Sequence, residues 1–365
     1  MGISNTFNPD YSVHPGEFLD ELIDVYDIEQ AELAMRLGIT PKHLSNIVNG
    51  KASITAKTAV ALEYIFPDRP VRYWLGLQNA YDEFEARKAN REQSSSEDSK
   101  KWLERFDFAT LEEAEYIPKL KADAGVWDRT CSLLTFFGCS SIAAWKQVYG
   151  SLDTHASGYW DERGSLSLAW MRKGQINAAY RAYLLPRFER RAFGRSLRKI
   201  ETLVRNSGEV TPDKLQEQCE KAGVLLTIEK PLPTMKARSA SFWMRNTPVV
   251  QLRADFLTDD EPLLDFAREA AEILKGKTYS MSLHDGDWSI DGPCKDALEW
   301  LTLWERSYAF AAKKDYSSDA VRRFAEEEGV HPGIVVGLLQ RRGIIAPDSS
   351  LNSLKSFVSY GVVSF

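Results

Sequence analysis

The sequence predicts a mainly α-helical protein that carries one small β-sheet, an α+β fold. Apolar residues recur at helical spacing through most of the first 205 residues. Three short apolar runs with strand character follow at residues 224–229, 237–244 and 247–252, the last two separated by a turn-like Arg-Asn-Thr-Pro segment. Helical spacing then returns over residues 317–343. A chain of 365 residues is long enough for two or three domains.

We predict domains at residues 12–91, 92–205 and 206–365. The first boundary is indicated by ANREQSSSEDSKK at residues 89–101, which is rich in serine and charge and has no apolar anchor. Such a segment is either an exposed linker or a solvated continuation of the preceding helix. The middle region is predicted to be helical, and the strands fall in the last region.

Composition indicates a soluble cytoplasmic protein. Hydrophobic residues make up 44% of the chain and charged residues 27%, and no apolar run is long enough to span a membrane. The four cysteines include no Cys-x-x-Cys pair, which favours a reducing compartment. Because the net charge is −6, nucleic acid would have to bind at a locally basic site.

The strongest local pattern is IEQAELAMRLGITPKHLSNIVNGK, residues 28–51. A first helix is expected to turn an apolar face inward, formed by Ala31, Leu33, Ala34 and Leu37. Gly38 is placed to end this helix and permit a tight turn, and Ile39 to fill the corner. The first helix therefore stops abruptly, which a helix-turn-helix requires.

The second helix of this pattern has a start signal and a buried stripe. Thr40 is expected to cap it, with Pro41 at the first helical position. Leu44, Ile47 and Val48 follow at the spacing of one buried face. Two short helices joined at a glycine also occur in all-α domains whose polar faces are merely solvated, so the spacing alone leaves both interpretations open.

The polar face of the second helix is suited to contact base edges. Donor-rich side chains at the start of such a helix reach into the major groove, and lysine and asparagine pair with guanine and adenine. The predicted base-reading residues are Thr40, Lys42, His43, Ser45, Asn46 and Asn49. Phosphate contacts are expected from Gln30, Lys51 and Lys57. From Ile28 to Lys57 the chain has two acids and four bases, so this patch is locally positive.

Residues 14–84 resemble the HigA-like antitoxins of the Xre helix-turn-helix family. The matching stretches are HPGEFLDELI, QAELAMRLGIT, LSNIVNGKASIT, ALEYIF and YWLGLQNAYDEFE. The resemblance implies a five-helix, lambda-repressor-like domain that acts as a homodimer on a palindromic double-stranded operator. It also implies an antitoxin that represses its own promoter and neutralises a cognate toxin protein.

Most of the remaining chain is similar to long HigA-type regulators that carry an ImmA/IrrE-like, zincin-like domain. The stretches are LLTFFGCSSIAAW, LAWMRKGQINA, RKIETL, AGVLLTIEKPLPTMKARSASFWMRNTPVVQL and FAEEEGVHPGIVVGLLQRRGII followed by LNSLKS. In that family the helix after VVQLRADFLTDDE carries the zinc-binding His-Glu-x-x-His. The segment at this place here is DFAREAAEIL, residues 265–274.

The zinc motif is degenerate in this sequence. Arg268 and Glu272 stand at the two histidine places, and only the intervening Glu269 is kept. A guanidinium has no lone pair to offer a metal and repels a cation. We therefore expect no metal, no cofactor and no enzymatic activity. Arg268 and Glu272 are expected to form an exposed ion pair, and Glu269 to be kept for its helix propensity alone.

Substitute metal ligands are not expected either. The family's third ligand is a glutamate on a later helix, to which Glu305 would correspond, but its spacing to Phe310 is one residue too long. His284, Asp285 and Asp287 lie in SLHDGDWS, which is interpreted as an exposed turn.

The functions of a basic stretch and of a possible ligand-binding cleft in the second half of the chain are left open by the sequence. The basic stretch Arg187–Lys199 is either a solvated helix face or a second surface for nucleic acid or a protein partner. A protease-like cleft without metal can still bind a peptide, a small molecule or a nucleic acid. The alternatives to the antitoxin hypothesis are a stress- or phage-responsive regulator that senses a ligand through this domain, and an active ImmA-like metallopeptidase.

Overall fold

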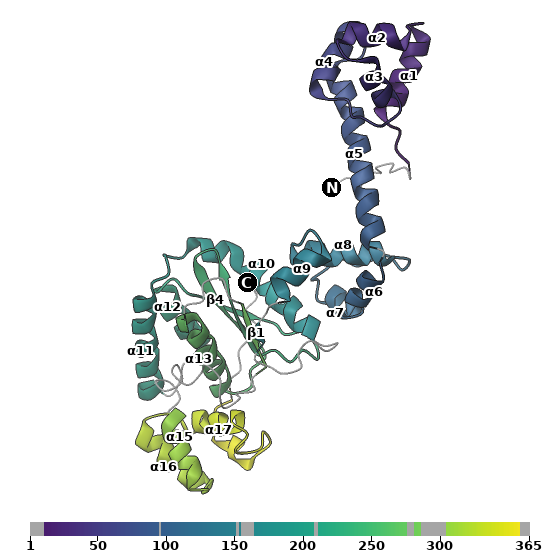
Figure 1. Ribbon diagram of the computed structural model, residues 1–365. Coiled ribbons are helices and arrows are strands. Elements are labelled where there is room, and N and C mark those ends of the chain that lie inside the picture. Colours follow the sequence, from purple (N-terminus) through teal and green to yellow (C-terminus); the bar gives the residue numbers. More distant parts are fainter. Residues whose placement is uncertain are drawn as a thin grey trace. The chain divides into compact units, whose positions relative to one another are not determined.

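The chain divides into two compact units, Met1–Glu97 and Asp98–Phe365 (Figure 1). The expected boundary between residues 205 and 206 lies inside the second unit, within helix α11, Arg190–Ser207. None of the described helices is long and apolar enough to cross a membrane. The computed structural model describes residues 11–94, 96–150, 153–154, 164–207, 211–275, 281–285 and 304–357.

The N-terminal unit is built from five helices around one apolar core, as expected. Its core is formed by fully buried side chains on each helix, namely Leu19, Leu33, Leu44, Leu62 and Trp74. The helices are α1 (Pro15–Val25), α2 (Gln30–Leu37), α3 (Pro41–Val48), α4 (Ala56–Ile65) and α5 (Val71–Ser94).

The polar segment at residues 89–101 is largely helical. Helix α5 continues to Ser94, and α6 covers Glu97–Leu103. The second of the two alternatives, a solvated continuation of the helix, therefore describes its first part. Trp102 and Leu103 at the end of α6 are buried and belong to the core of the second unit.

The second unit contains a five-stranded sheet in the order β1-β5-β3-β4-β2. Strands β3 and β4, on either side of the expected turn, form an antiparallel hairpin, while β2 pairs parallel with β4. Strands β1 and β5 were not expected from the sequence. The strands are β1 (Asp153–Thr154), β2 (Leu225–Glu229), β3 (Ser239–Met244), β4 (Thr247–Arg253) and β5 (Ser282–His284).

Helices cover both faces of the sheet, so alternate strand residues enter two different cores. Leu225 and Val249 face the core that includes α8 (Val126–Phe137), α9 (Ile142–Tyr149) and α10 (Gly164–Leu184). Their neighbours Leu226 and Val250 face the opposite core, formed with α11, α12 (Pro212–Glu220) and α13 (Asp260–Lys275). A further short helix, α7, spans Phe108–Glu113.

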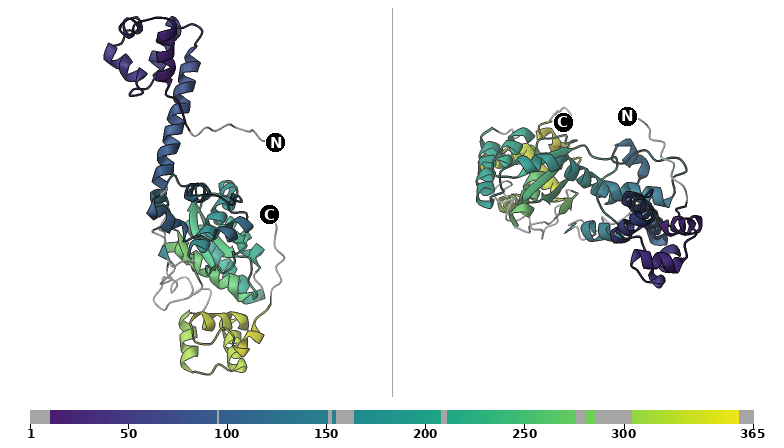
Figure 2. Two further views of the ribbon diagram at one scale, coloured as in Figure 1. Left: turned by 90° about the vertical axis from the view of Figure 1, so that its right-hand side faces the viewer. Right: turned by 90° about the horizontal axis from the view of Figure 1, so that it is seen from above.

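The C-terminal helices form a separate cluster beside α13, drawn in yellow tones in Figures 1 and 2. The two helices expected over residues 317–343 are present, and Ile334 and Leu338 of the second join the core around α13. The elements are α15 (Trp304–Ala312), α16 (Ser318–Glu328), α17 (Pro332–Arg341) and the 3-10 helix η1 (Ser350–Leu354).

The tripeptide His-Pro-Gly begins two helices in the same way. His14 precedes α1 and His331 precedes α17, both in an extended conformation. In each case the imidazole Nδ1 accepts a hydrogen bond from the glycine N–H, at 2.9 Å in α1 and 3.2 Å in α17. Proline at the first helical position has no N–H that would need a partner. Burial lowers the pKa of His14, which agrees with an Nδ1 that accepts and carries no proton.

Gly16 in the first of these motifs lies where no side chain fits. A Cβ at this position would be 2.0 Å from the carbonyl oxygen of Ile47 and 2.8 Å from that of Val48. The start of α1 therefore touches the backbone at the C-terminal end of α3. This contact fixes the end of the helix that carries the candidate base-reading residues.

The Gly16→Ala substitution should destabilise the N-terminal unit, because the two chain segments must separate to admit the methyl group. We expect a loss of about 1–3 kcal/mol, measured by calorimetric unfolding of the full chain. Gly76→Ala is the matched control, since an added Cβ there meets nothing within 4 Å and helix propensity should raise stability by up to about 1 kcal/mol. Equal unfolding profiles for the two variants would contradict the close contact.

Candidate nucleic-acid interface and the buried carboxylate of α13

The turn between α2 and α3 has the geometry that the sequence predicts. Gly38 adopts the left-handed conformation, with φ of 67°, and ends α2. The N–H of Ile39 then donates to the carbonyl of Ala34 at 3.1 Å, and the Ile39 side chain packs against the domain core. Thr40 caps α3 by accepting a hydrogen bond from the N–H of His43 at 3.2 Å, with Pro41 at the first helical position.

The inward faces of the two helices are confirmed with one correction. Leu33, Ala34 and Leu37 of α2 are buried, but Ala31 is exposed. Helix α2 begins only at Gln30, so Ala31 lies in its first turn on the solvent side. In α3 the expected stripe is present, because Leu44 and Ile47 are fully buried and Val48 is half-buried.

The candidate base-reading residues lie together on α3 and its cap. Thr40, Lys42 and Asn49 are exposed, and His43, Ser45 and Asn46 are half-buried. Leu44 and Ile47 anchor the opposite side of the helix in the core, which leaves this face turned outward. Helix α3 thus presents short polar side chains and one exposed lysine on a rigid support.

Several of the candidate residues form hydrogen bonds within the domain. The Asn49 side-chain amide donates to the Ser45 carbonyl oxygen at 2.7 Å and to Ser45 Oγ at 3.2 Å. Asn49 is therefore engaged in closing the last turn of α3, a role that the sequence pattern did not indicate. Gln30 is exposed at the first position of α2, where its amide donates to Asp20 Oδ1 at 3.4 Å. Lys51 and Lys57 are both exposed.

Glu269, the glutamate of the segment that resembles a zinc-binding helix, is fully buried in α13 and surrounded by hydrogen-bond partners. Ser239 Oγ donates to Oε1 at 2.7 Å, and Ser282 Oγ donates to Oε2 at 2.9 Å. His284 Nδ1 lies 2.6 Å from Oε1, and Ser241 Oγ bonds to Ser282 Oγ at 2.7 Å. The expectation that Glu269 is kept only for helix propensity is therefore wrong. The signal in the sequence was the alternation of polar with apolar residues in SAS (residues 239–241) and SLH (residues 282–284).

Arg268 and Glu272, which stand at the two histidine places of the motif that this segment resembles, are buried and half-buried. Arg268 is only 4% exposed, because α13 is covered by the sheet on one side and helices on the others. The carboxylate of Glu272 pairs with Lys275 at 2.7 Å, one turn further along the helix. The expected exposure of Arg268 is thus a wrong prediction that follows from treating α13 as a surface helix.

His284 also departs from its expected environment. It belongs to strand β5 and is 2% exposed, so the interpretation of this position as an exposed turn is wrong. Asp287 and the side chain of Glu305 lie outside the described residues. Among the residues that the structure describes, no three His, Cys, Asp or Glu side chains are grouped closely enough to hold a metal ion.

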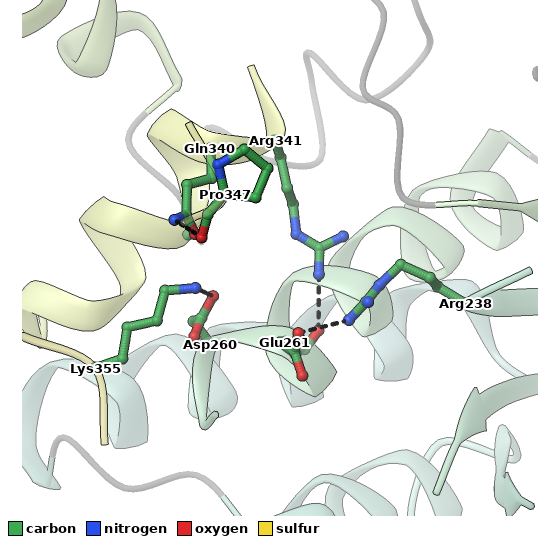
Figure 3. Close-up of a pocket in the computed structure, with 8 residues that line it drawn as sticks. Arg238, Asp260, Glu261, Gln340, Arg341, Pro347 and Lys355 are labelled. Atoms are coloured by element: carbon green, nitrogen blue, oxygen red, sulfur yellow. Dashed lines mark hydrogen bonds and ion pairs between the residues drawn. The ribbon is translucent and has the colours of Figure 1, made fainter. Parts of the chain in front are cut away.

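A cavity of about 200 Å³ lies between the first turn of α13 and helix α17 (Figure 3). Its charged side chains pair across the gap, with Lys355 Nζ 2.9 Å from Asp260 and Arg238 3.2 Å from Glu261. One turn further along α13, Asp265 is 2% exposed. Its carboxylate forms ion pairs with Arg238, at 3.2 Å, and with Arg341, at 2.5 Å. These pairs join the C-terminal helices to α13, so we interpret this cavity as a structural contact.

The comparisons with known proteins agree on the N-terminal unit. Residues 26–67 match the helix-turn-helix family. Over 74 residues the chain is 34% identical to the uncharacterized HTH-type transcriptional regulator YddM of Escherichia coli, a match that covers 20% of this chain and 78% of that protein. Over 69 residues it is 39% identical to virulence-associated protein A' of Dichelobacter nodosus, covering 19% of this chain and 60% of that protein.

Two solved structures are similar to the same fraction of the chain. One is an addiction module antidote protein of the HigA family from Coxiella burnetii, 37% identical, with a TM-score of 0.21. That match covers 23% of this chain and 92% of the other. The second is the Pseudomonas aeruginosa antitoxin HigA with the higBA promoter, 34% identical, with a TM-score of 0.22, covering 24% of this chain and 95% of the other.

Replacing Glu269 by glutamine should change how stability depends on pH. Burial alone would raise the pKa of Glu269, but the charge and hydrogen bond of His284 and the hydroxyl of Ser239 together lower it below its usual 4.5. The ionised carboxylate therefore stabilises the folded chain fully when the pH is above the unfolded pKa of 4.5. This contribution is lost as the pH falls through the lowered pKa of the folded state. We expect the free energy of unfolding of the unmodified chain to fall more steeply than that of Glu269→Gln between about pH 5 and pH 3.

Chemical denaturation at a series of pH values measures this difference. Glu272→Gln is the control, since it removes a carboxylate from the same helix at a position that pairs with Lys275 rather than with the buried cluster. At neutral pH Glu269→Gln should be the less stable of the two variants. Parallel pH profiles for Glu269→Gln and the unmodified chain would show that folding does not shift the pKa of this carboxyl and would contradict the predicted lowering.

Proposed function

We propose, from the premise that this chain belongs to the helix-turn-helix family, that it is a sequence-specific DNA-binding transcriptional regulator. The observation that carries the proposal is the outward face of α3, a firmly packed helix with a capped start, which presents Lys42 in its first turn and Asn46 one turn later. A second helix with short donors near its N-terminus is the element that enters the major groove in this motif.

The contacts divide into those that read bases and those that position the protein. Lys42 is suited to guanine O6 and N7, and Asn46 to the N6 and N7 atoms of adenine. His43 and Ser45 flank them on the same helix. Gln30, Lys51 and Lys57 are exposed around this face and are proposed to contact phosphates, which fixes the register without selecting sequence.

We further propose that the protein acts as a homodimer on a palindromic operator. A single α3 reads only a few base pairs, and two copies related by a two-fold axis read half-sites about 34–36 Å apart, one helical turn of DNA. Support for an antitoxin that represses its own promoter and neutralises a cognate toxin comes from the resemblance of residues 14–84 to HigA-like antitoxins. The second unit would then serve as a non-catalytic sensing or partner-binding domain.

Substituting Lys42 or Asn46 with alanine should weaken binding to the cognate operator by about 1–3 kcal/mol each, because each side chain is assigned to one base. The operator can be selected from random duplexes and affinity measured by gel shift at fixed salt. Lys88→Ala and Asn90→Ala remove the same groups from exposed positions on α5 and serve as matched controls. Operator affinity that survives the Lys42→Ala and Asn46→Ala double change would mean that another face reads the DNA.

We also propose that the second unit does not act as a metallopeptidase. The argument rests on residues that are present: an arginine without a lone pair stands at the first histidine place, and both oxygens of Glu269 accept hydrogen bonds from protein groups. A general base in a zinc hydrolase needs a carboxylate oxygen directed at the metal-bound water. The buried carboxylate of this chain is directed at hydroxyl groups and an imidazole instead.

Metal analysis tests this proposal. The full chain is incubated with zinc, dialysed without chelator and analysed by plasma mass spectrometry, alongside Glu269→Gln. We expect both proteins to retain far less than one zinc per chain. One zinc per chain in the unmodified protein, lost in Glu269→Gln, would restore the metallopeptidase hypothesis.

A further inference from the structure

A second cavity, of about 350 Å³, opens on the far side of the sheet unit from the charged contact at the start of α13. It lies where three segments meet: the connection between α10 and α11, the β3–β4 turn, and the last turn of α13. The described lining residues include cations, aromatic rings and an amide but no carboxylate. They are Arg187, Phe188, Arg190, Trp243, Asn246, Ile273 and Lys275.

Two aromatic rings form one wall of this cavity. Phe188 and Trp243 meet edge to face, with ring centroids 5.5 Å apart and planes at 87°. Both side chains are half-buried, so each ring has one part packed in the protein and another part accessible. Their mutual contact holds the rings in place before any ligand arrives, which lowers the entropic cost of stacking a flat group there.

The cations are placed around the same opening. Arg190 donates to the carbonyl oxygen of Leu274 and is thereby held at the C-terminal end of α13. Lys275, in the last turn of that helix, pairs with Glu272 at 2.7 Å. Arg187 is exposed, one residue before Phe188. Because the carboxylate of Glu272 offsets the charge of Lys275, the net positive charge at the cavity comes from Arg187 and Arg190.

We propose that this cavity binds a nucleoside phosphate. The base would lie against the rings of Phe188 and Trp243, and the phosphate would be held by Arg187 and Arg190, the two cations whose charge no carboxylate at the cavity offsets. Flat π-systems stack on aromatic side chains, and guanidinium groups recognise phosphate oxygens with two parallel hydrogen bonds. The exposed amide of Asn246, next to Trp243 in the β3–β4 turn, offers both a donor and an acceptor to the edge of a base.

The nucleotide could be free or part of a single strand. Helix α11 continues away from the cavity with further exposed cations, Arg191, Arg195, Arg198 and Lys199. A strand would place its next phosphates along this face, whereas a free nucleotide would use the cavity alone. Both sources share the same chemistry at Arg187 and Trp243.

This inference deepens the sensing role proposed for the second unit, and it rests on residues that the helix-turn-helix does not include. Binding is therefore measured without operator DNA. Loss of operator recognition in the α3 variants and loss of nucleotide binding at this cavity are separate outcomes, and either can occur alone.

Isothermal titration of the full chain tests the proposal with four probes: adenosine monophosphate, uridine monophosphate, inorganic phosphate and a twelve-residue oligothymidylate. We expect one mononucleotide site per chain, bound more tightly than inorganic phosphate. Arg187→Gln should weaken it about tenfold through the loss of a charge-assisted contact. Arg195→Gln removes the same charge from the exposed face of α11 and should change mononucleotide affinity less than about twofold.

A second pair of variants tests the aromatic wall. Trp243→Leu should reduce the preference for mononucleotides over inorganic phosphate, while Trp127→Leu, at a half-buried position on α8, should leave it unchanged. Circular dichroism and thermal unfolding of each variant show whether the fold is kept. If Trp243→Leu unfolds the unit, Arg187→Gln and the preference over phosphate still decide the question.

The oligothymidylate separates the two sources. Tighter binding than the mononucleotide, with Arg187→Gln more damaging than Arg195→Gln, supports the site with a single strand as its ligand. No mononucleotide binding, equal affinity for inorganic phosphate, or equal effects of Arg187→Gln and Arg195→Gln would overturn the proposal.

Discussion

The buried carboxylate of Glu269 is the constraint on which the second unit depends. A carboxylate without partners in an apolar interior is so costly that every donor around it must stay in place. Its partners Ser239 and His284 are directly opposite each other on β3 and β5, and Ser241 is opposite Ser282 in the same way. Because strand side chains alternate between faces, a slip of one residue in this pairing would turn these groups away from α13. One charge thereby fixes both the strand register and the position of the helix.

The same helix carries the contacts to the rest of the unit. One turn before Glu269, Asp265 accepts Arg238 from the sheet side and Arg341 from α17. At the other end, Arg190 from α11 bonds to the carbonyl of Leu274. Between these polar contacts, Leu264, Phe266 and Ala267 are buried in the surrounding core. Helix α13 therefore contacts the sheet, the basic helix α11 and the C-terminal cluster. Because these elements surround α13, the side chain of Arg268 is inaccessible to solvent.

Features that depend on neighbouring residues, such as helix ends, caps and strands, could be predicted from the sequence. The stop at Gly38, the cap at Thr40 and the three strands between residues 224 and 253 follow from backbone preference and periodicity, and the structure confirms them. It did not predict β5, because three residues give too short a pattern to separate a strand from a turn. The partners of Glu269 were missed because they are brought together by sheet pairing across about forty residues, which no spacing rule reports. Ala31 was wrongly assigned to the core because it lies in the first turn of α2, on the solvent side.

The segment of α13 whose sequence resembles a zinc-binding helix forms polar contacts inside the second unit. Arg268 and Glu272 make ligation at the two histidine places impossible or incomplete, yet Glu269 is held by three protein groups. The hydroxyl and imidazole groups donate hydrogen bonds to this carboxylate and thereby stabilise its buried negative charge. Since α13 is fixed in its middle in this way, an anion that binds at its C-terminal end would find Lys275 and Arg190 already positioned. The connection between α10 and α11 that carries Arg187 and Phe188 is closely packed as well, since a Cβ at Gly223 would be 2.5 Å from the carbonyl oxygen of Pro186.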